Sequence, residues 1–286
     1  MNLHSVGILD RLTLALLRVL PTNLLSRLTG IVAAIPLPFP LNVLILRAYA
    51  FLFGVDRAEV QYPLSKYLSL QSFFTRALKP DARPVDPNPD SIVSPVDGTL
   101  VRVEEVTDGT LLQAKGWHYA VRDLLGDARQ ASRYLGGSAC TLYLSPADYH
   151  RIHMPLSGTV ESLHYLPGRL FPVNRFSLFR IENLFLLNER LILHIRTQAG
   201  NIAMVLVGAT NVGKIRVRFD DVHRRFSLQG PYARSYSREI FLEKGEEVGR
   251  FELGSTVILL FEKERVRLSP GEGVRTKMGS AIGFLP

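Results

Sequence analysis

The stretch EIFLEKGEEVGRFELGSTVILLF, residues 239–261, contains strand-like runs separated by a turn. KGEE has the composition of a turn, and STVILLF is rich in β-branched residues. Short apolar or alternating runs also precede this stretch, back to Ser91: IVSPVDG, TLVRVEEV, CTLYLS, GTVESLHYL, LILHIR, AMVLVGAT and GKIRVRF. Their length predicts strands, so we expect a mostly β body with few helices, of which WHYAVRDLLG at 117–126 is the clearest.

Helices are expected before this body. Residues 5–20 repeat leucines at helical spacing, residues 41–53 form a second apolar helix, and residues 64–78 a third. Four prolines in residues 79–91 predict a linker. The expected organisation is an N-terminal helical region (1–78), a proline-rich linker (79–91) and a β-rich domain (92–286).

The uncharged segment Gly30–Leu46 is a candidate membrane span, but its composition argues against that interpretation. Pro36, Pro38 and Pro40 lie in its middle, and each removes a backbone donor from a helix. We therefore expect two helical pieces with a proline break. Leucine-rich helices with a few arginines can lie among lipid headgroups. The alternative is a helical hairpin packed on the protein's own core.

Composition narrows the function classes. The 286 residues, 47% of them hydrophobic, suit one large or two modest domains. With 34 basic and 26 acidic residues the formal charge is +8, which favours an anionic partner such as nucleic acid or an acidic membrane. The basic residues are dispersed without a nucleic-acid-binding signature, which weakens the first option. Cys140 is the only cysteine and excludes a disulfide framework.

Two segments carry candidate acid–base residues. SPVDGTL (94–100) contains Asp97, although Asp-Gly alone indicates only a turn. SPADYHRIHMP (145–155) contains His150 and His153, whose imidazoles titrate near neutral pH and suit acid–base catalysis. Structural histidines are the alternative. No metal is expected, because no HExxH pattern or cysteine cluster accompanies the pair.

A third segment, FELGSTVILLF (251–261), places Gly254 and Ser255 between two strand-like runs. Alone, this pair indicates a hairpin turn or a bulge, and it does not fit the GxSxG elbow of hydrolases. One aspartate, one histidine and one serine could form an Asp–His–Ser relay.

Together, SPVDG, SPADYHRIHMP and LGST resemble the signature segments of phosphatidylserine decarboxylases of the bacterial and mitochondrial type. Further stretches agree, from about residue 65 to the C-terminus and in the family's order: QAKGWHYAVRDLLG, LPGRLFPVN, NLFLLNER and VGATNVG. One position departs from the family pattern, since Val96 precedes the Asp-Gly pair where alanine is expected.

The resemblance implies a self-processing proenzyme with an α+β fold similar to barrel-sandwich hybrid domains. Ser255 would attack the carbonyl of Gly254, cut the chain and become a covalent pyruvoyl group, the cofactor that forms a Schiff base with the substrate amine. His153 would take the serine proton and Asp97 would orient that imidazole. His150 is implied in acid–base chemistry during decarboxylation, although the two histidines could be exchanged.

The implied products of cutting are a chain of residues 1–254 and a chain of residues 255–286, which stay together. The implied substrate is phosphatidylserine in an anionic membrane, and phosphatidylethanolamine and CO2 are the products. The resemblance implies a peripheral enzyme on the cytoplasmic side of the inner membrane, with homo-oligomerisation open. The alternatives are a pyruvoyl-dependent decarboxylase of a soluble amino acid, a serine hydrolase using Ser255 intact, and a non-enzymatic membrane-bound β module.

Overall fold

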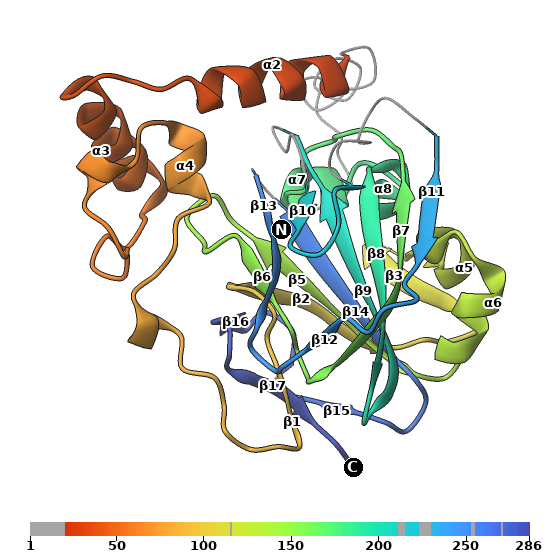
Figure 1. Cartoon of the computed structure of the whole chain (residues 1–286). Coiled ribbons are helices and arrows are strands. Elements are labelled where there is room, and N and C mark those ends of the chain that lie inside the picture. Colours follow the sequence, from red (N-terminus) through yellow and green to blue (C-terminus); the bar gives the residue numbers. More distant parts are fainter. Residues whose placement is uncertain (1–20, 115, 211–214, 223–229, 253–254, 270) are drawn as a thin grey trace.

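A computed structural model describes residues 21–286 except residues 115, 211–214, 223–229, 253–254 and 270 (Figure 1). Its helices gather in the N-terminal part, and short ones interrupt the body. They are α2 (Thr22–Ala34), α3 (Leu41–Phe53), α4 (Leu70–Phe74), α5 (Val121–Leu125), α6 (Ala128–Ala131), α7 (Arg175–Leu178) and α8 (Leu184–Leu187), with 3-10 turns at Leu64–Lys66, Pro80–Ala82 and Ser132–Tyr134.

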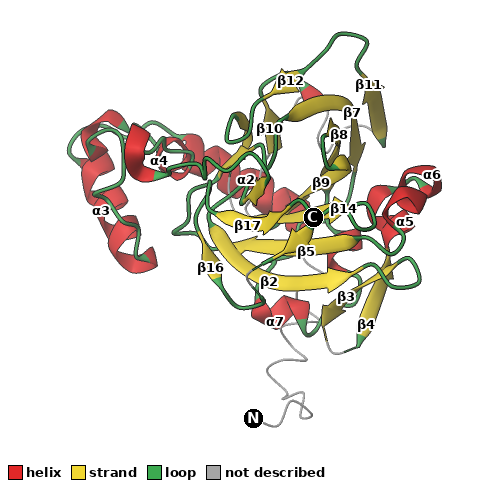
Figure 2. Ribbon diagram, turned by 90° about the horizontal axis from the view of Figure 1, so that it is seen from below, coloured by secondary structure: helices red, strands yellow, loops and turns green. Residues whose placement is uncertain are grey.

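The body is built on a nine-stranded antiparallel sheet in the order β11-β7-β8-β9-β14-β5-β2-β16, with β12 also paired to β7 (Figure 2). Its strands are β2 (Gly98–Glu105), β5 (Ser138–Leu144), β7 (Gly158–Leu166), β8 (Arg190–Thr197), β9 (Gly200–Gly208), β11 (Tyr232–Ser235), β12 (Phe241–Leu242), β14 (Ser255–Phe261) and β16 (Arg275–Thr276).

Three smaller sheets complete the described part of the body. The first pairs β10 (Ile215–Val217), β13 (Glu247–Phe251) and β6 (Arg151–His153). The second pairs β1 (Ser91–Val93), β17 (Ala281–Phe284) and β15 (Arg267–Leu268). The third pairs β3 (Thr110–Ala114) with β4 (Trp117–Ala120).

Strand β14 lies inside the large sheet and is buried along its whole length. It pairs with β9 on one side and with β5 on the other. Successive side chains point to opposite faces, so Val257 and Leu259 belong to one apolar core, and Ile258 and Leu260 to the other. Burial on both faces explains why STVILLF is apolar throughout rather than alternating.

The structure confirms the β-rich body and several predicted elements. KGEE forms the turn between β12 and β13, where Gly245 has a φ of +80° that favours glycine. Helix α3 covers the predicted residues 41–53, and residues 35–40 separate it from α2. The helix predicted over residues 5–20 lies outside the described residues. Within the described part of the chain, no helix has both the length and the hydropathy needed to span a bilayer.

Two helix predictions were wrong in part. Residues 64–78 form a 3-10 turn and then α4, because Ser69 is extended and caps a new helix, accepting a hydrogen bond from Ser72 N at 3.1 Å. In residues 117–126 only Val121–Leu125 are helical. Trp117–Ala120 instead pair with β3 as strand β4, so cross-strand pairing overrides the local helical pattern.

Candidate active site

Ser255 begins β14 at the point where that strand enters the large sheet. Its strand partners are Leu144 on β5 and Gly208 on β9. The residue is 2% exposed, and its Oγ is buried without a hydrogen-bond partner. A buried hydroxyl without a partner is costly and uncommon in folded proteins, which marks this oxygen as a functional candidate. Gly254, the other residue of the predicted cleavage site, lies outside the described residues.

His150 lies between β5 and β6 and is fully buried. Its Nδ1 is 2.8 Å from the carbonyl oxygen of Asp148. A carbonyl only accepts, so Nδ1 carries the proton and Nε2 is the acceptor, which is buried without a partner. The ring packs against Phe74, and burial lowers its pKa to about 3. Phe251 N donates to the His150 carbonyl at 3.0 Å, which places His150 beside the strand that precedes Ser255.

His153 ends β6, and both of its ring nitrogens are engaged. Nδ1 donates to the carbonyl of Gly245 at 2.8 Å, so Nε2 accepts from the hydroxyl of Tyr149 at 3.1 Å. Burial lowers the pKa of His153, and the nearby carboxylates of Glu247 and Asp97 oppose that shift. Unlike His150, this imidazole has negative charges close enough to stabilise its protonated form.

Asp97 follows β1 and belongs to a cluster of charged side chains with Arg83 and Glu59. Its Oδ1 accepts from Arg83 Nε at 2.7 Å and from the backbone N–H of Met278 at 2.9 Å. Arg83 also binds Glu59 at 2.8 Å, and this hydrogen bond lowers the pKa of Glu59 to about 2. The Asp97 carboxylate is therefore paired with a guanidinium rather than with an imidazole.

The structure brings the SPVDG and SPADYHRIHMP segments together without forming the predicted direct relay. His153 N donates to Pro95 O at 2.8 Å, so the two segments are adjacent. In this conformation the Gly245 carbonyl, and not Asp97, accepts from His153 Nδ1, so the orienting role of Asp97 stays a prediction. No His153–Ser255 hydrogen bond forms either, since Tyr149 occupies Nε2 and the serine oxygen has no partner.

Comparison with known proteins identifies the chain's relatives. The family model described as phosphatidylserine decarboxylase matches residues 70–284. The chain belongs to this family. The phosphatidylserine decarboxylase proenzyme of Myxococcus xanthus (strain DK1622) is 42% identical over 278 residues, covering 96% of this chain and 99% of the relative. The proenzymes of Anaeromyxobacter sp. (strain K) and Azotobacter vinelandii (strain DJ / ATCC BAA-1303) are 44% and 43% identical, each covering 96% of this chain and 98% of the relative.

In this member of the phosphatidylserine decarboxylase family, sequence reasoning missed several site residues. Tyr149 lies inside the SPADYHRIHMP segment, and its position four residues before His153 could have suggested the contact. Gly245 comes from the KGEE turn, which is distant in sequence and carries no chemical signal. Arg83 lies in the predicted linker, where a proline-rich composition hides its buried ion pair with Asp97.

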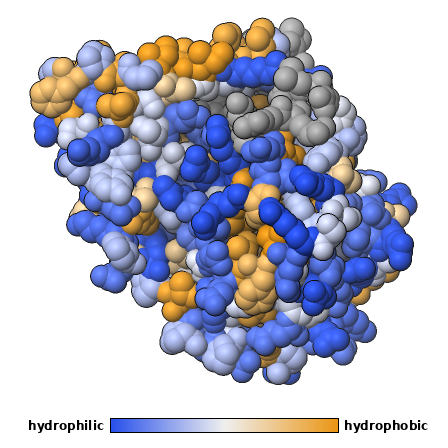
Figure 3. All heavy atoms as spheres, viewed as in Figure 1, coloured by the Kyte–Doolittle hydropathy of each residue, from blue (hydrophilic) through white to orange (hydrophobic). Residues whose placement is uncertain are grey.

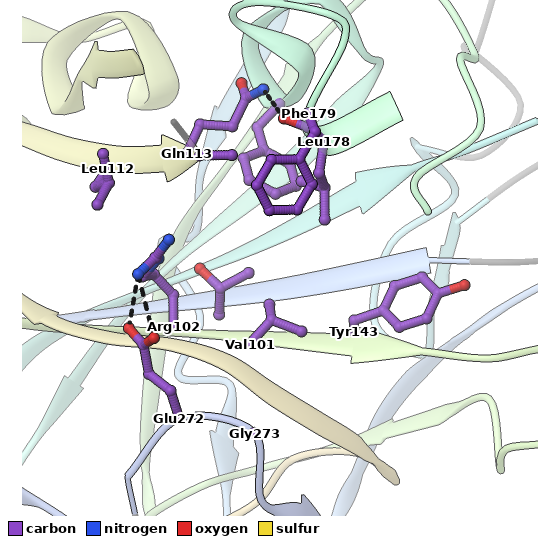
Figure 4. A pocket seen from close by; sticks show the side chains of 12 residues that line it. Val101, Arg102, Leu112, Gln113, Tyr143, Leu178, Phe179, Glu272 and Gly273 are labelled. Atoms are coloured by element: carbon purple, nitrogen blue, oxygen red, sulfur yellow. Dashed lines mark hydrogen bonds and ion pairs between the residues drawn. The ribbon is translucent and has the colours of Figure 1, made fainter. Parts of the chain in front are cut away.

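One pocket of this decarboxylase family member lies apart from these residues. It has a volume of about 590 Å³ and lies between β2, β3, β5 and the α7–α8 segment (Figure 4). Phe179 and Leu178 form one wall, and an Arg102–Glu272 ion pair lies opposite them. Tyr143, which also lines the pocket, precedes Leu144 on β5, so its side chain points to the opposite face of the sheet from Ser255. None of the predicted site residues lines this pocket.

Proposed function

We propose that the chain is a self-processing, pyruvoyl-dependent decarboxylase that converts phosphatidylserine to phosphatidylethanolamine and CO2. The observation that carries the proposal is that Ser255 Oγ, at the start of β14, is buried without a hydrogen-bond partner, and so is His150 Nε2. A hydrolase would need its serine hydrogen-bonded to a base and exposed to substrate. A serine whose target is the adjacent peptide bond needs neither exposure nor room for an external acyl group.

Self-cleavage begins with attack of Ser255 Oγ on the carbonyl carbon of Gly254, which replaces the peptide bond by an ester. Elimination then breaks the bond between Cβ and Oγ of residue 255 and frees the Gly254 carboxylate. Water converts the remaining dehydroalanine to a keto group, and ammonia leaves. The products are residues 1–254 and residues 255–286, the second with a pyruvoyl end.

The assignment of His153 to the cutting step is supported by electrostatics. The base that takes the serine proton becomes a cation, and Asp97 and Glu247 lie close enough to His153 to favour that charge. His150 instead lies near the Arg76 cation, which lowers its pKa further. For His153 to act, its Nε2 must exchange Tyr149 for Ser255.

A pyruvoyl group at residue 255 would supply an electron sink for a substrate with a primary amine. His150 then has the acid–base role in decarboxylation. Its Nδ1–H is fixed on the Asp148 carbonyl, which leaves a buried Nε2 whose lone pair has no partner in the folded chain. The Phe74 ring excludes water from one side of this imidazole.

A lipid substrate requires the enzyme to reach a bilayer, and the N-terminal helices present a suitable surface. Helices α2 and α3 direct their polar contacts inward, since Asn23 binds the Gly168 carbonyl at 2.9 Å and Tyr49 binds that of Pro146 at 2.9 Å. Large apolar side chains point outward instead, and they form a continuous apolar zone along α2 (Figure 3). These side chains are Leu24, Leu25, Leu28, Ile31, Val32, Ile35, Phe39, Leu41, Leu44, Ile45, Phe51, Leu52 and Phe53. Phe51 is 91% exposed, although a large aromatic side chain is normally buried in a water-soluble protein. Such exposure favours peripheral membrane contact.

Intact mass with peptide mapping tests the proposed function. We expect two chains, the shorter beginning at residue 255 with a pyruvoyl-blocked end, and a single uncut chain for Ser255→Ala. Release of CO2 from phosphatidylserine but not from free amino acids separates this proposal from a soluble amino-acid decarboxylase. A fully active, uncut protein with an ordinary Ser255 would refute it.

Membrane contact is tested by co-sedimentation with vesicles that contain phosphatidylserine. The double variant Phe51→Ser with Leu52→Ser should bind about tenfold more weakly or worse, because two side chains lose burial in lipid. Leu135→Ser with Leu187→Ser is the matched control, since these leucines are also exposed but lie on the body. Equal binding by both double variants would contradict a membrane role for α3.

A further inference from the structure

Arg76 is a buried cation without a matching anion. It follows α4 and is 4% exposed. Its Nη2 donates to the carbonyls of Ala147 at 2.6 Å and Asp148 at 3.1 Å. Its Nε and Nη1 are buried and have no hydrogen-bond partner. No carboxylate of the described residues forms an ion pair with it.

The neighbouring cations are satisfied. Arg83 binds Asp97 and Glu59, and Lys277 binds Glu59 at 2.8 Å. Arg275 forms an ion pair with Asp148. Burying a guanidinium without an anion is costly, and burial lowers the pKa of Arg76 accordingly. The contrast indicates that Arg76 is completed by a group that the chain itself does not provide.

A cavity of suitable size adjoins this guanidinium. It has a volume of about 200 Å³, and its lining includes four cations, Arg76, Arg83, Arg275 and Lys277, and four carboxylates, Asp56, Glu59, Asp97 and Asp148. Three of these carboxylates already pair with the cations other than Arg76. The cavity volume equals the liquid volume of about seven water molecules, which is enough for one solvated tetrahedral anion. It is too small for an acyl chain together with a headgroup.

The cavity lies next to both histidines. The Asp148 carbonyl accepts from Arg76 Nη2 at 3.1 Å and from His150 Nδ1 at 2.8 Å, so the guanidinium and that imidazole share one oxygen. Tyr149, which also lines the cavity, donates to His153 at 3.1 Å. An anion held here would be fixed at a short distance from the acid–base groups.

We propose that Arg76 binds the phosphodiester group of the lipid substrate, an inference that rests on the proposed function. The substrate also carries a carboxylate, but that group loses its charge as CO2 leaves. A guanidinium on it would stabilise the ground state more than the transition state and slow the reaction. The phosphodiester keeps its charge in substrate and product alike, so holding it anchors the headgroup without opposing the chemistry.

The test compares Arg76→Gln with Arg196→Gln in processed enzyme acting on a short-chain phosphatidylserine. Arg196 is the matched control, because it loses the same charge from an exposed ion pair with Glu161. Arg76 would bind the phosphodiester equally well in the substrate complex and in the transition state. We therefore expect KM to rise by about 10- to 100-fold in Arg76→Gln, while kcat changes less than about threefold. Arg196→Gln should match the wild type. A purely structural Arg76 would lower the yield of cut, active enzyme without this split.

Two soluble competitors identify the group that Arg76 holds. Glycerophosphoglycerol has the phosphodiester without an amine or carboxylate, and N-acetylserine has the carboxylate without a phosphate. We expect only the first to inhibit the wild type competitively, and this inhibition should be lost in Arg76→Gln. Inhibition by N-acetylserine that Arg76→Gln abolishes would overturn the proposal.

The wild-type measurements keep the proposal testable if Arg76→Gln is not cut. Competitive inhibition by glycerophosphoglycerol, retained in the charge-conserving variant Arg76→Lys, would support it, and its absence in the wild type would overturn it. Wild-type enzyme without activity on phosphatidylserine would refute the proposed function itself. An active wild type with an unchanged KM in Arg76→Gln would refute only the Arg76 assignment.

Discussion

His150 and His153 lie three residues apart in one segment, yet their surroundings are opposite. His150 is enclosed by Phe74 and the Asp148 carbonyl near the Arg76 cation, with one ring nitrogen free. His153 has both nitrogens occupied and two carboxylates nearby. The first environment keeps an imidazole neutral, and the second tolerates a positive charge.

Under the proposed function, this difference would let one short segment serve two reactions. Cutting needs a base whose cationic form is stabilised, whereas decarboxylation in a closed site needs a neutral group with a free lone pair. The alternation of side chains around β6 separates the two imidazoles into these environments.

Replacing each histidine in turn should give the largest effects. His153→Ala should slow cutting by about 10²- to 10⁴-fold, the usual contribution of a positioned base. His150→Ala should be cut normally but lose decarboxylation by a similar factor. Gels of freshly purified protein and CO2 release measure the two steps, and exposed His118→Ala serves as the control. An uncut His150→Ala chain would exchange the two roles.

Neutralising Asp97 should have a smaller effect, because the structure gives it an electrostatic rather than a direct contact with His153. We expect Asp97→Asn to slow cutting by about tenfold, because the base loses one of the two carboxylates that favour its protonated form. Glu59→Gln is the control, since it removes the other carboxylate bound to Arg83. Equal cutting rates for both variants would remove Asp97 from the relay.

Removing the Tyr149 hydroxyl should show whether its hydrogen bond to His153 limits cutting. Tyr149→Phe frees His153 Nε2, so cutting should be at least as fast as in the wild type, and up to about tenfold faster if one hydrogen bond limits the step. Tyr67→Phe is the matched control, because its buried hydroxyl has no side-chain partner. Time courses of chain cutting decide the matter, and slower cutting would make Tyr149 part of the machinery.

The smallest effect concerns pH. The pKa of His150 falls from 6.5 to about 3 on folding, so below pH 6.5 the unfolded chain binds a proton that the folded chain does not. Stability should therefore decline as pH falls, by about 1.4 kcal/mol between pH 7.5 and 5.5 from this group. Urea unfolding of Ser255→Ala, with and without His150→Phe, measures it. If the free energy of unfolding falls equally with pH whether or not His150 is replaced, the His150 imidazole is not held neutral in the folded chain.

Local pattern predicted much of the fold and less of the site. The apolar runs around β14 predict strands because each is buried on at least one face, and prolines 36, 38 and 40 predict the break between α2 and α3. The strand at Trp117–Ala120 could not be predicted, since only its partner β3 favours it over a helix.

The candidate site shows the same limit. The signature segments contain Asp97, His150, His153 and Ser255, but hydrogen-bond partners come from elsewhere. The Gly245 carbonyl and Arg83 reach the site through a turn and a linker, and neither position differs locally from a solvated loop. Which atom holds an imidazole depends on tertiary contacts, and no spacing in the sequence encodes them.

The central position of strand β14 also bears on the order of folding and chain cutting. Because it fills the slot between β5 and β9, the edges of those two strands would be unpaired without it. If the bond at 254–255 is cut as proposed, we expect the large sheet to form before cutting, so that maturation follows folding. If residues 1–254 were made as a separate chain, the edges of β5 and β9 would be unpaired. Such a chain would be prone to aggregate before residues 255–286 could bind.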